Sequence, residues 1–299
     1  MIPRVTAQIR LTRIGIVVHP RRDLDNALGS LHAWAERGGA EVVQIPMEGV
    51  DRVVAEPGTP KSCDLIVALG GDGTTLAALH AGATAGKPVL GVACGSLGAL
   101  TATSADRIEE ALQALSAGEW EARRLPGIEV TADGSLLGVA INDFVVVRKG
   151  ASQIAVQIDV DGEPFIRFAG DGIVIAPPLG SSAYTMAAGG PVLAQTTESI
   201  VLTPVAPHGG TCPPLVVGRD SALRVKIEPG HYGARIELDG RTQDLLPPTL
   251  SLGWRDDYAT LVAFAGAESL LAGLRRRGIL RDSPRVVARE ERATAITRR

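Results

Sequence analysis

The stretch LIVALGGDGTTLAALHAGA, residues 65–83, joins two sequence patterns at a glycine-rich corner. It opens with an uninterrupted apolar run, which is typical of a strand buried on both faces of a sheet. After the corner GGDGT, residues 70–74, apolar residues return at helical spacing. We therefore predict a strand, a tight corner that carries one carboxylate, and a helix over about residues 75–85.

The same alternation surrounds this stretch on both sides. Upstream, the apolar run IGIVV begins at Ile14, helical spacing follows, and the run EVVQI begins at Glu41. Downstream, the run KPVLGVA begins at Lys87, and a helix is expected around residues 105–115. Strands that alternate with helices predict a parallel sheet covered by helices on both faces. We assign this α/β domain to residues 1–125.

After Pro126 the pattern changes to short β-rich runs separated by turns. Asp-Gly pairs beginning at 133, 161, 171 and 239 suit tight turns between antiparallel strands, so residues 126–264 are predicted to form a mainly β domain. Over residues 265–281, an apolar face of Leu270, Leu271 and Leu274 predicts a helix that packs back on the first domain. The Arg- and Glu-rich residues 282–299 are predicted to be a mobile charged tail, with at most a partly formed helix.

Composition and charge exclude several classes of protein. The 299 residues are 45% hydrophobic and 21% charged, which suits a folded protein with an ample core. A net charge of −3 gives no general attraction to nucleic acid or anionic lipid. The three cysteines form no Cys-x-x-Cys pair, and neither a secretory leader pattern nor an 18-residue apolar run occurs. We expect a cytoplasmic protein with neither a nucleic-acid nor a membrane partner.

The glycine corner suits phosphate chemistry. Ligands of parallel sheets bind beyond the carboxyl ends of the strands, where glycines let backbone N–H groups approach an anion at a helix N-terminus. Asp72 would repel a phosphate, so its carboxylate would instead accept a proton from an attacking hydroxyl or hold a magnesium ion. The alternative is a tight turn in which Asp72 only caps the helix. The corner matches neither the P-loop pattern nor Gly-x-Gly-x-x-Gly.

Further motifs carry a resemblance to a known family. Residues 70–74 (GGDGT), 142–144 (NDF), 170–193 (GDGIVIAPPLGSSAYTMAAGGPVL) and 202–208 (LTPVAPH) together resemble the NAD kinase family, collinearly over residues 14–240. The resemblance implies a Rossmann-like α/β domain followed by a β-sandwich-like domain, with NAD in the cleft between them. It also implies transfer of the γ-phosphate of ATP to the 2'-hydroxyl of the adenosine ribose, with Asp72 as general base. A divalent cation, Mg²⁺, would arrive with ATP rather than on protein ligands, and the chain would form a homodimer or homotetramer.

The resemblance also assigns binding residues. In the first domain they are Gly70, Gly71, Gly73 and Thr74, and in the second Asn142, Asp143, Asp171, Ser182, Ala183 and Tyr184. Asp143 stands where the family usually has Glu, and Ser182 where it has Thr. Structural roles remain open for several of them: a plain turn for Asn142 and Asp143, an Asp-Gly turn for Asp171, and packing for Tyr184.

Two departures from the family pattern concern the acceptor site. Ala93 stands where the family has Asn, and Ala99 where it has a Phe that lies against adenine. Losing that aromatic contact removes about 0.5–1.5 kcal/mol of binding energy. Two other functions therefore stay open: a kinase for another nucleoside or small alcohol, and a nucleotide-binding regulator without turnover. The pattern distinguishes neither ATP from polyphosphate as donor nor NAD from NADH as acceptor.

Overall fold

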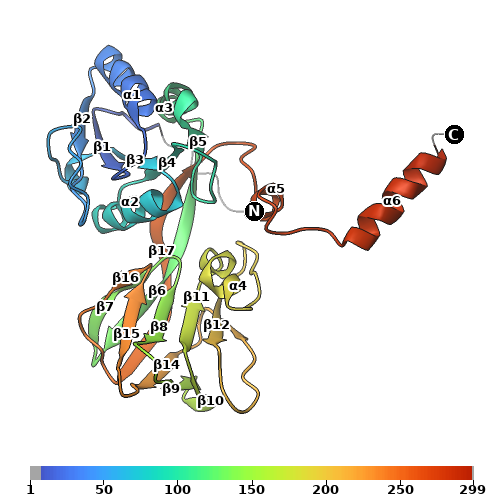
Figure 1. Ribbon diagram of the computed structural model, residues 1–299. Coiled ribbons are helices and arrows are strands. Elements are labelled where there is room, and N and C mark those ends of the chain that lie inside the picture. Colours follow the sequence, from blue (N-terminus) through green and yellow to red (C-terminus); the bar gives the residue numbers. More distant parts are fainter. Residues whose placement is uncertain (1–7, 298–299) are drawn as a thin grey trace.

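The computed structural model describes residues 8–297, which form an α/β part and a β-rich part, one above the other in Figure 1. The α/β part is built on parallel strands in the order β2-β1-β3-β4, and a short β5 also pairs with β4. These strands are β1 (Arg13–Val18), β2 (Glu41–Gln44), β3 (Leu65–Gly70), β4 (Val89–Ala93) and β5 (Thr103–Ser104).

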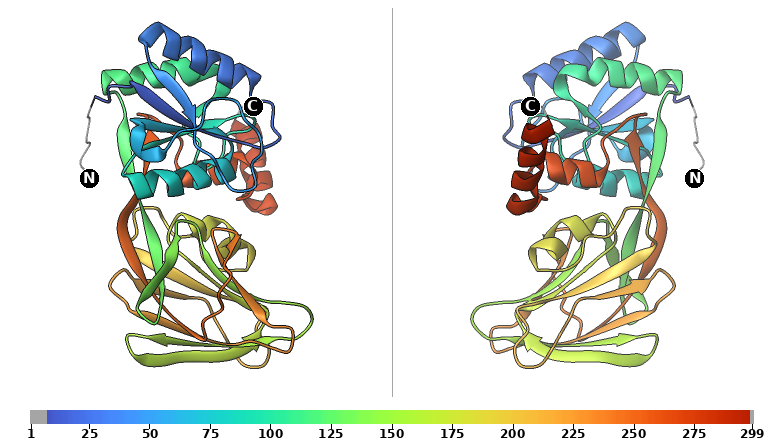
Figure 2. Two further views of the ribbon diagram at one scale, coloured as in Figure 1. Left: turned by 90° about the vertical axis from the view of Figure 1, so that its left-hand side faces the viewer. Right: turned by 90° about the vertical axis from the view of Figure 1, so that its right-hand side faces the viewer.

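Helices cover both faces of this sheet, as Figure 2 shows. They are α1 (Asp25–Gly38), α2 (Asp72–Ala85) and α3 (Ile108–Ala117), with the 3-10 turns η1 (Pro60–Ser62) and η2 (Ala105–Arg107). Leu31 of α1 and Leu112 of α3 pack in one core, whereas Leu79 of α2 packs in another on the opposite face. All six residues of β3 are buried, which explains its continuous apolar run. The parallel sheet with two covered faces is confirmed.

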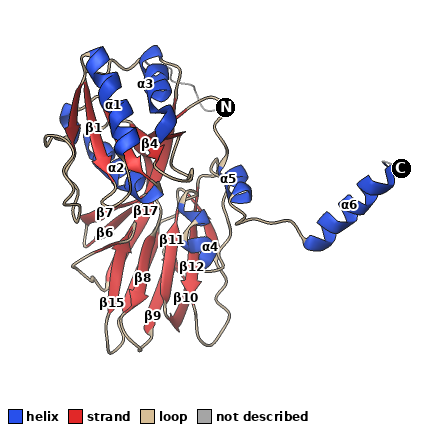
Figure 3. Cartoon of the chain, turned by 45° about the horizontal axis from the view of Figure 1, so that its top comes forward, coloured by secondary structure: helices blue, strands red, loops and turns tan. Residues whose placement is uncertain are grey.

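The β-rich part consists of two packed sheets (Figure 3). One has the strand order β13-β12-β11-β8-β15-β16. The other contains β10, β9, β14, β17, β6 and β7. Their bounds are β6 (Glu121–Ala132), β7 (Ser135–Ala140), β8 (Phe144–Arg148), β9 (Ile154–Val160), β10 (Glu163–Gly170), β11 (Gly172–Ala176), β12 (Ser199–Val205), β13 (Leu215–Gly218), β14 (Leu223–Glu228), β15 (Ala234–Leu238), β16 (Arg241–Thr242) and β17 (Thr249–Ala263). Alternating residues of both sheets, including Phe144 and Val156, share one core, so the predicted sandwich-like domain is confirmed.

Two long strands run through both parts of the molecule. β17 pairs antiparallel with β6 and joins the parallel sheet beside β4, where Leu261 lies opposite Val89. The larger sheet is therefore one surface of 11 strands that passes from one domain into the other. The expected boundary between residues 125 and 126 falls inside β6, so the two domains are joined by paired strands rather than by a linker.

Three of the four Asp-Gly pairs form the expected turns. Asp133, Asp161 and Asp239 have φ values of 47°, 53° and 51°, and each is followed by a glycine that also has positive φ. Asp171 does not share this conformation: it lies between β10 and β11, which belong to different sheets. The prediction of a tight turn at 171 was wrong, because the chain crosses between sheets there instead of reversing within one.

The C-terminal segment differs from the prediction in two respects. Helix α5 (Leu270–Arg276) begins after Ser269, whose side chain accepts a hydrogen bond from the Ala272 amide at 3.2 Å. Leu270 and Leu274 are buried, but Leu271 is exposed and does not belong to the apolar face. Where a partly formed helix in a mobile tail was predicted, residues 284–297 form the helix α6 (Pro284–Thr297), which extends away from the rest of the chain (Figure 1).

Within the described residues, no helix combines the length and the apolar character needed to cross a bilayer.

Candidate active site

The corner at residues 70–74 is tighter than expected. β3 ends at Gly70 and α2 begins at Asp72, three residues earlier than the apolar spacing indicated. A Cβ at Gly70 would lie 2.2 Å from the Thr74 Oγ1, so only glycine fits under the first turn of the helix. Gly73 faces open space and is exposed. The corner therefore presents the N–H groups of the first helical turn to solvent, as an anion-binding site requires.

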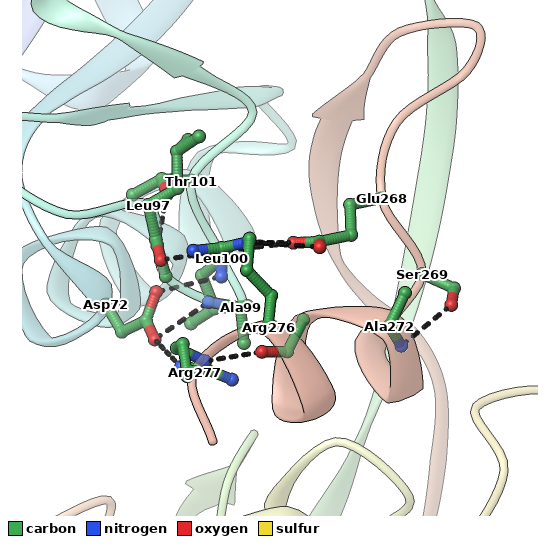
Figure 4. Close-up of polar contacts among 12 residues, drawn as sticks. Asp72, Leu97, Ala99, Leu100, Thr101, Glu268, Ser269, Ala272, Arg276 and Arg277 are labelled. Atoms are coloured by element: carbon green, nitrogen blue, oxygen red, sulfur yellow. Dashed lines mark hydrogen bonds and ion pairs between the residues drawn. The ribbon is translucent and has the colours of Figure 1, made fainter. Parts of the chain in front are cut away.

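The Asp72 carboxylate is held by a neighbouring loop, as Figure 4 shows. Its Oδ2 accepts a hydrogen bond from the Ala99 amide and its Oδ1 from the Leu100 amide, both at 2.9 Å. Within residues 8–297, no side chain caps α2, so the alternative in which Asp72 serves only as a helix cap does not hold. The side chain remains 38% exposed, which leaves the carboxylate accessible to a ligand.

Gly98 fits against this carboxylate for a steric reason. A Cβ at this position would lie 2.0 Å from Oδ1 and 2.6 Å from Oδ2 of Asp72. Glycine therefore lets the loop amides reach both oxygens.

We expect the substitution Gly98→Ala to lower kcat by about 10- to 100-fold, because a displaced carboxylate loses its productive alignment. Steady-state turnover would measure this loss. Gly253→Ala is a suitable control, since a Cβ there would meet nothing within 4 Å. Equal turnover of the Gly98→Ala variant and the wild type would contradict the steric argument.

A cavity of about 310 Å³ lies over the glycine corner. The corner itself contributes Gly71, Asp72, Gly73 and Thr74, and the segment after β1 contributes His19 and Arg22. Arg241 of β16 also lines it, so the second domain reaches the same space. The cavity thus combines helix-terminal amides, cationic side chains and one carboxylate, the groups expected around a polyphosphate.

His19 has a local structural role. Its Nδ1 accepts hydrogen bonds from the amides of Arg21 and Arg22, both at 3.1 Å. Burial lowers the pKa of His19, and the neighbouring guanidinium groups of Arg22, Arg21 and Arg52 lower it further. The imidazole is therefore neutral and orders the turn that follows β1. Arg22 in turn donates to the carbonyl oxygens of Gly70 and Cys94, both at 3.3 Å, and so joins β3 to β4.

Asn142 and Asp143 lie in the loop between β7 and β8, where Asp239 holds them. Oδ1 of Asp239 accepts hydrogen bonds from the amides of Asn142 (2.7 Å) and Asp143 (2.9 Å), and Oδ2 accepts one from Ile141 (2.8 Å). Oδ2 also lies 2.6 Å from Nε2 of His80, a residue of α2. The Asp239 side chain is only 1% exposed. One buried carboxylate therefore connects the helix of the glycine corner to the predicted acceptor-binding loop.

Asp143 itself is buried, with 8% of its surface exposed. Burial raises the pKa of its carboxyl to about 7, with further contributions from the charges of Asp239 and Glu237. A carboxyl that titrates near neutrality can donate a hydrogen bond when protonated and accept one when ionised, and a sugar hydroxyl can pair with either form.

The second predicted binding segment contacts the first. η3 (Gly180–Ser182) lies against Asn142, since a Cβ at Gly180 would be 1.6 Å from the Asn142 carbonyl oxygen. Ser182 donates through its hydroxyl to the Leu179 carbonyl oxygen at 3.1 Å. Tyr184, the first residue of α4 (Tyr184–Ala187), is 39% exposed, and Ala183 is also exposed. The packing alternative for Tyr184 therefore fits the structure less well than a ring that is open to a ligand.

Asp171 is paired with a cation instead of being free. Nε of Arg148 donates to its Oδ1 at 2.5 Å, and Nη2 lies 3.4 Å from its Oδ2. The Asp171 amide donates to the Val205 carbonyl oxygen at 3.0 Å. These contacts fix the crossing between the sheets, and the structure does not bring Asp171 into the cavity over the corner.

Ala93 and Ala99, the two residues that depart from the family pattern, have different surroundings. Ala93 ends β4 and is buried. Ala99 lines a second cavity of about 140 Å³, which is also lined by Leu100, Leu270 and Arg277. Among the described residues, no group of three or more His, Cys, Asp or Glu side chains is suited to a metal ion.

Sequence reasoning missed several residues at this site. They are His80, Gly98, Asp239, Arg241 and Arg277. The Asp239-Gly240 pair gave a signal, but one that indicated only a turn. His80 stands two helical turns after the corner on the same helix, and that spacing could have identified it.

Comparisons with known proteins agree with this geometry. A family profile described as the ATP-NAD kinase N-terminal domain matches residues 35–120, and one described as the ATP-NAD kinase C-terminal domain matches residues 141–249. The chain is 36% identical to the NAD kinase of Desulforamulus reducens over 77% of this chain and 84% of that one. It is 31% identical to the NAD kinase of Wolinella succinogenes over 77% and 82%, respectively.

Solved structures show the same fold. Yeast NADH kinase complexed with NADH superposes with a TM-score of 0.75 at 21% identity, covering 91% of this chain and 89% of that one. An NAD kinase from Archaeoglobus fulgidus in complex with ATP gives 0.68 at 24% identity, covering 89% and 97%. Together with the two profiles, which match more than half of the chain, these similarities show that the protein belongs to the NAD kinase family of phosphotransferases with an alcohol group as acceptor.

Proposed function

We propose that the protein transfers the γ-phosphate of ATP to the 2'-hydroxyl of the adenosine ribose of NAD, with Asp72 as the general base. The observation that carries this proposal is the position of Asp72. Two loop amides fix its carboxylate at the start of α2, on the wall of a cavity that is also lined by Gly71, Gly73 and Thr74. The alternatives, a kinase for another alcohol and a silent regulator, are not favoured by the relatives.

The mechanism follows from this arrangement. The ribose oxygen attacks the γ-phosphorus in line with the departing ADP oxygen, while the Asp72 carboxylate accepts the hydroxyl proton. The new O–P bond forms as the bond between phosphorus and the β,γ-bridging oxygen breaks. Amides of the first turn of α2 and the guanidinium groups of Arg22 and Arg241 would face the phosphate chain from the cavity wall.

A divalent cation fits the cavity as a companion of ATP. Besides the proposed base Asp72, the carboxylate of Glu48 lines the same space, and carboxylate oxygen is a ligand that Mg²⁺ accepts. When bound, the cation would neutralise charge on the phosphates. One such carboxylate is too few for a full protein-built site, which is consistent with a cation held mainly by the nucleotide.

The acceptor would occupy the space between the corner and the loops of the second domain. We assign its binding to Asn142, Asp143, Ser182, Ala183 and Tyr184, of which Ala183 and Tyr184 are exposed and Asp143 is buried. Ala99 gives adenine no aromatic wall, so the Tyr184 ring is the aromatic surface available for stacking. We further propose a cytoplasmic homo-oligomer, in which a neighbouring subunit can supply part of the acceptor site.

A coupled assay tests the function directly. Purified protein is incubated with ATP, Mg²⁺ and NAD, and NADP is detected by an NADP-specific dehydrogenase. We expect NADP to accumulate with the wild type when ATP, Mg²⁺ and NAD are all present. An absence of NADP from folded protein, with turnover of another acceptor in a panel of nucleosides and small alcohols, would contradict the proposal.

The buried Asp143 predicts a pH-dependent stability. Its folded pKa of about 7 lies above the value of 3.8 for an ordinary Asp, so the folded state binds more protons than the unfolded state between pH 4 and 7. Stability therefore decreases as the pH rises through this window. From pH 5 to pH 8 the titration of Asp143 should lower the unfolding free energy of the wild type by on the order of 2 kcal/mol. The Asp143→Asn variant should lack this part of the loss. Urea titrations at both pH values measure the difference.

The exposed Asp133 supplies the control for this measurement. Asp133→Asn should leave the pH dependence of stability unchanged. If Asp143→Asn has the same pH dependence as the wild type, the carboxyl of Asp143 does not titrate in this range.

A further inference from the structure

Three consecutive arginines at the end of α5 engage different partners. Both Nη atoms of Arg275 donate to the Asp282 carboxylate, at 2.9 and 2.6 Å. Arg276 donates through Nε to the Glu268 carboxylate and through Nη2 to the Leu97 carbonyl oxygen at 3.3 Å. Arg277 donates through Nε to the Gly273 carbonyl oxygen at 3.1 Å, and its Nη1 lies 3.9 Å from Oδ2 of Asp72. Arg276 therefore contacts the loop beside the corner, and Arg277 lies beside Asp72 itself (Figure 4).

These contacts converge on the loop that holds the carboxylate of Asp72. Arg276 binds the first residue of the segment 97–100, and the amides of Ala99 and Leu100 in that segment bind the carboxylate. Thr101 closes the same segment by accepting a hydrogen bond from the Gly98 amide at 2.8 Å. α5 thus contacts both the carboxylate and the loop that orients it, although it follows Asp72 by about 200 residues in the sequence.

We propose that Arg277 is a positioning residue for the catalytic base, and that α5 is the element that presents it. This inference rests on the proposed function of Asp72. The guanidinium is 26% exposed and is tethered to the last turn of its own helix through Gly273, so its charge is held beside the carboxylate. A separation of 3.9 Å is too long for a hydrogen bond, and the attraction is therefore mainly between charges.

In this proposal, the positive charge of Arg277 holds the orientation of the Asp72 carboxylate. Asp72 lies close to the space where phosphates and their cation bind, and a free carboxylate would turn toward that cation. A fixed positive charge on the opposite side, in the cavity lined by Ala99 and Leu100, keeps the carboxylate in the orientation set by the loop amides. One oxygen lone pair then remains directed at the acceptor hydroxyl.

Three variants of the full chain test this inference in the coupled NADP assay. Arg277→Gln should lower kcat by about 10- to 100-fold, the effect of a misplaced catalytic group, with KM for NAD within about threefold of the wild type. Arg277→Lys restores the charge and should recover kcat to within about fivefold of the wild type. Arg275→Gln is the matched control, because Arg275 is paired with Asp282 instead, and it should behave as the wild type.

The results of these assays distinguish a failure of this inference from a failure of the proposed function. Wild-type protein that makes no NADP would overturn the proposed function and this inference with it. If the wild type is active and Arg277→Gln retains at least half of its kcat, only the role of Arg277 is overturned. An equal loss of kcat in Arg277→Gln and Arg277→Lys would also overturn it, because charge would then not be the property that matters. Thermal unfolding midpoints confirm that each variant is folded.

Discussion

Replacement of Asp72 by Asn is expected to lower kcat for NADP formation by about 10²- to 10⁴-fold, which is the contribution of a positioned general base. The asparagine amide has nearly the size of the carboxylate but cannot accept the hydroxyl proton. Its oxygen can still accept one of the hydrogen bonds from Ala99 and Leu100, so the corner should keep its shape. The measurement is kcat in the coupled NADP assay at saturating ATP and NAD, with the thermal midpoint of the same preparation.

Asp64 offers a matched control for this substitution. Its carboxylate also accepts hydrogen bonds from backbone amides, those of Thr12 at 2.7 Å and Arg13 at 2.9 Å, but it does not line the cavity over the corner. Asp64→Asn should therefore cost stability and leave kcat nearly unchanged. If Asp72→Asn keeps more than a tenth of the wild-type kcat, another group takes the proton.

The sequence predicted those parts of this site that local patterns determine. The corner at 70–74 could be located because a fully buried strand must be apolar throughout and because only glycine fits under Thr74. The mainly β character of the second domain followed from Asp-Gly turns, three of which have the left-handed φ values that favour these residues, whereas its sandwich-like architecture was implied by the family resemblance. Both are consequences of backbone sterics within a few residues, so a single sequence is enough to find them.

What escaped prediction depends on contacts between distant segments. The loop amides that orient Asp72 come from 27 and 28 residues further along the chain. An amide carries no side-chain signature, and Ala99 and Leu100 look like ordinary apolar residues. The sharing of β6 and β17 between the domains is also hidden, because Pro126 and Gly127 suggest a break in the sequence although β6 continues through them as a strand paired with β17.

Asp239 combines a turn that local sequence determines with contacts to distant segments that it does not reveal. Its left-handed φ of 51° made the turn predictable, whereas its four hydrogen-bonding partners lie about 100 or more residues away. We expect Asp239→Asn to lower the free energy of unfolding by about 2–3 kcal/mol, because buried hydrogen bonds to a charged acceptor are lost. Asn tolerates the left-handed conformation, so the loss would not come from backbone strain. Urea titration at pH 7 measures the change.

The loss of stability is expected for both orientations of the new side-chain amide. If its NH₂ group replaces Oδ2, it faces the Ile141 amide and Nε2 of His80; if it replaces Oδ1, it faces the amides of Asn142 and Asp143. Either orientation opposes at least one backbone N–H donor, so the loop should shift and KM for NAD should rise together with the loss of stability. Asp133→Asn, at an exposed turn with nearly the same φ, should change stability by less than about 0.5 kcal/mol. Equal stabilities of the two variants would show that Asp239 serves its turn alone and does not connect the domains.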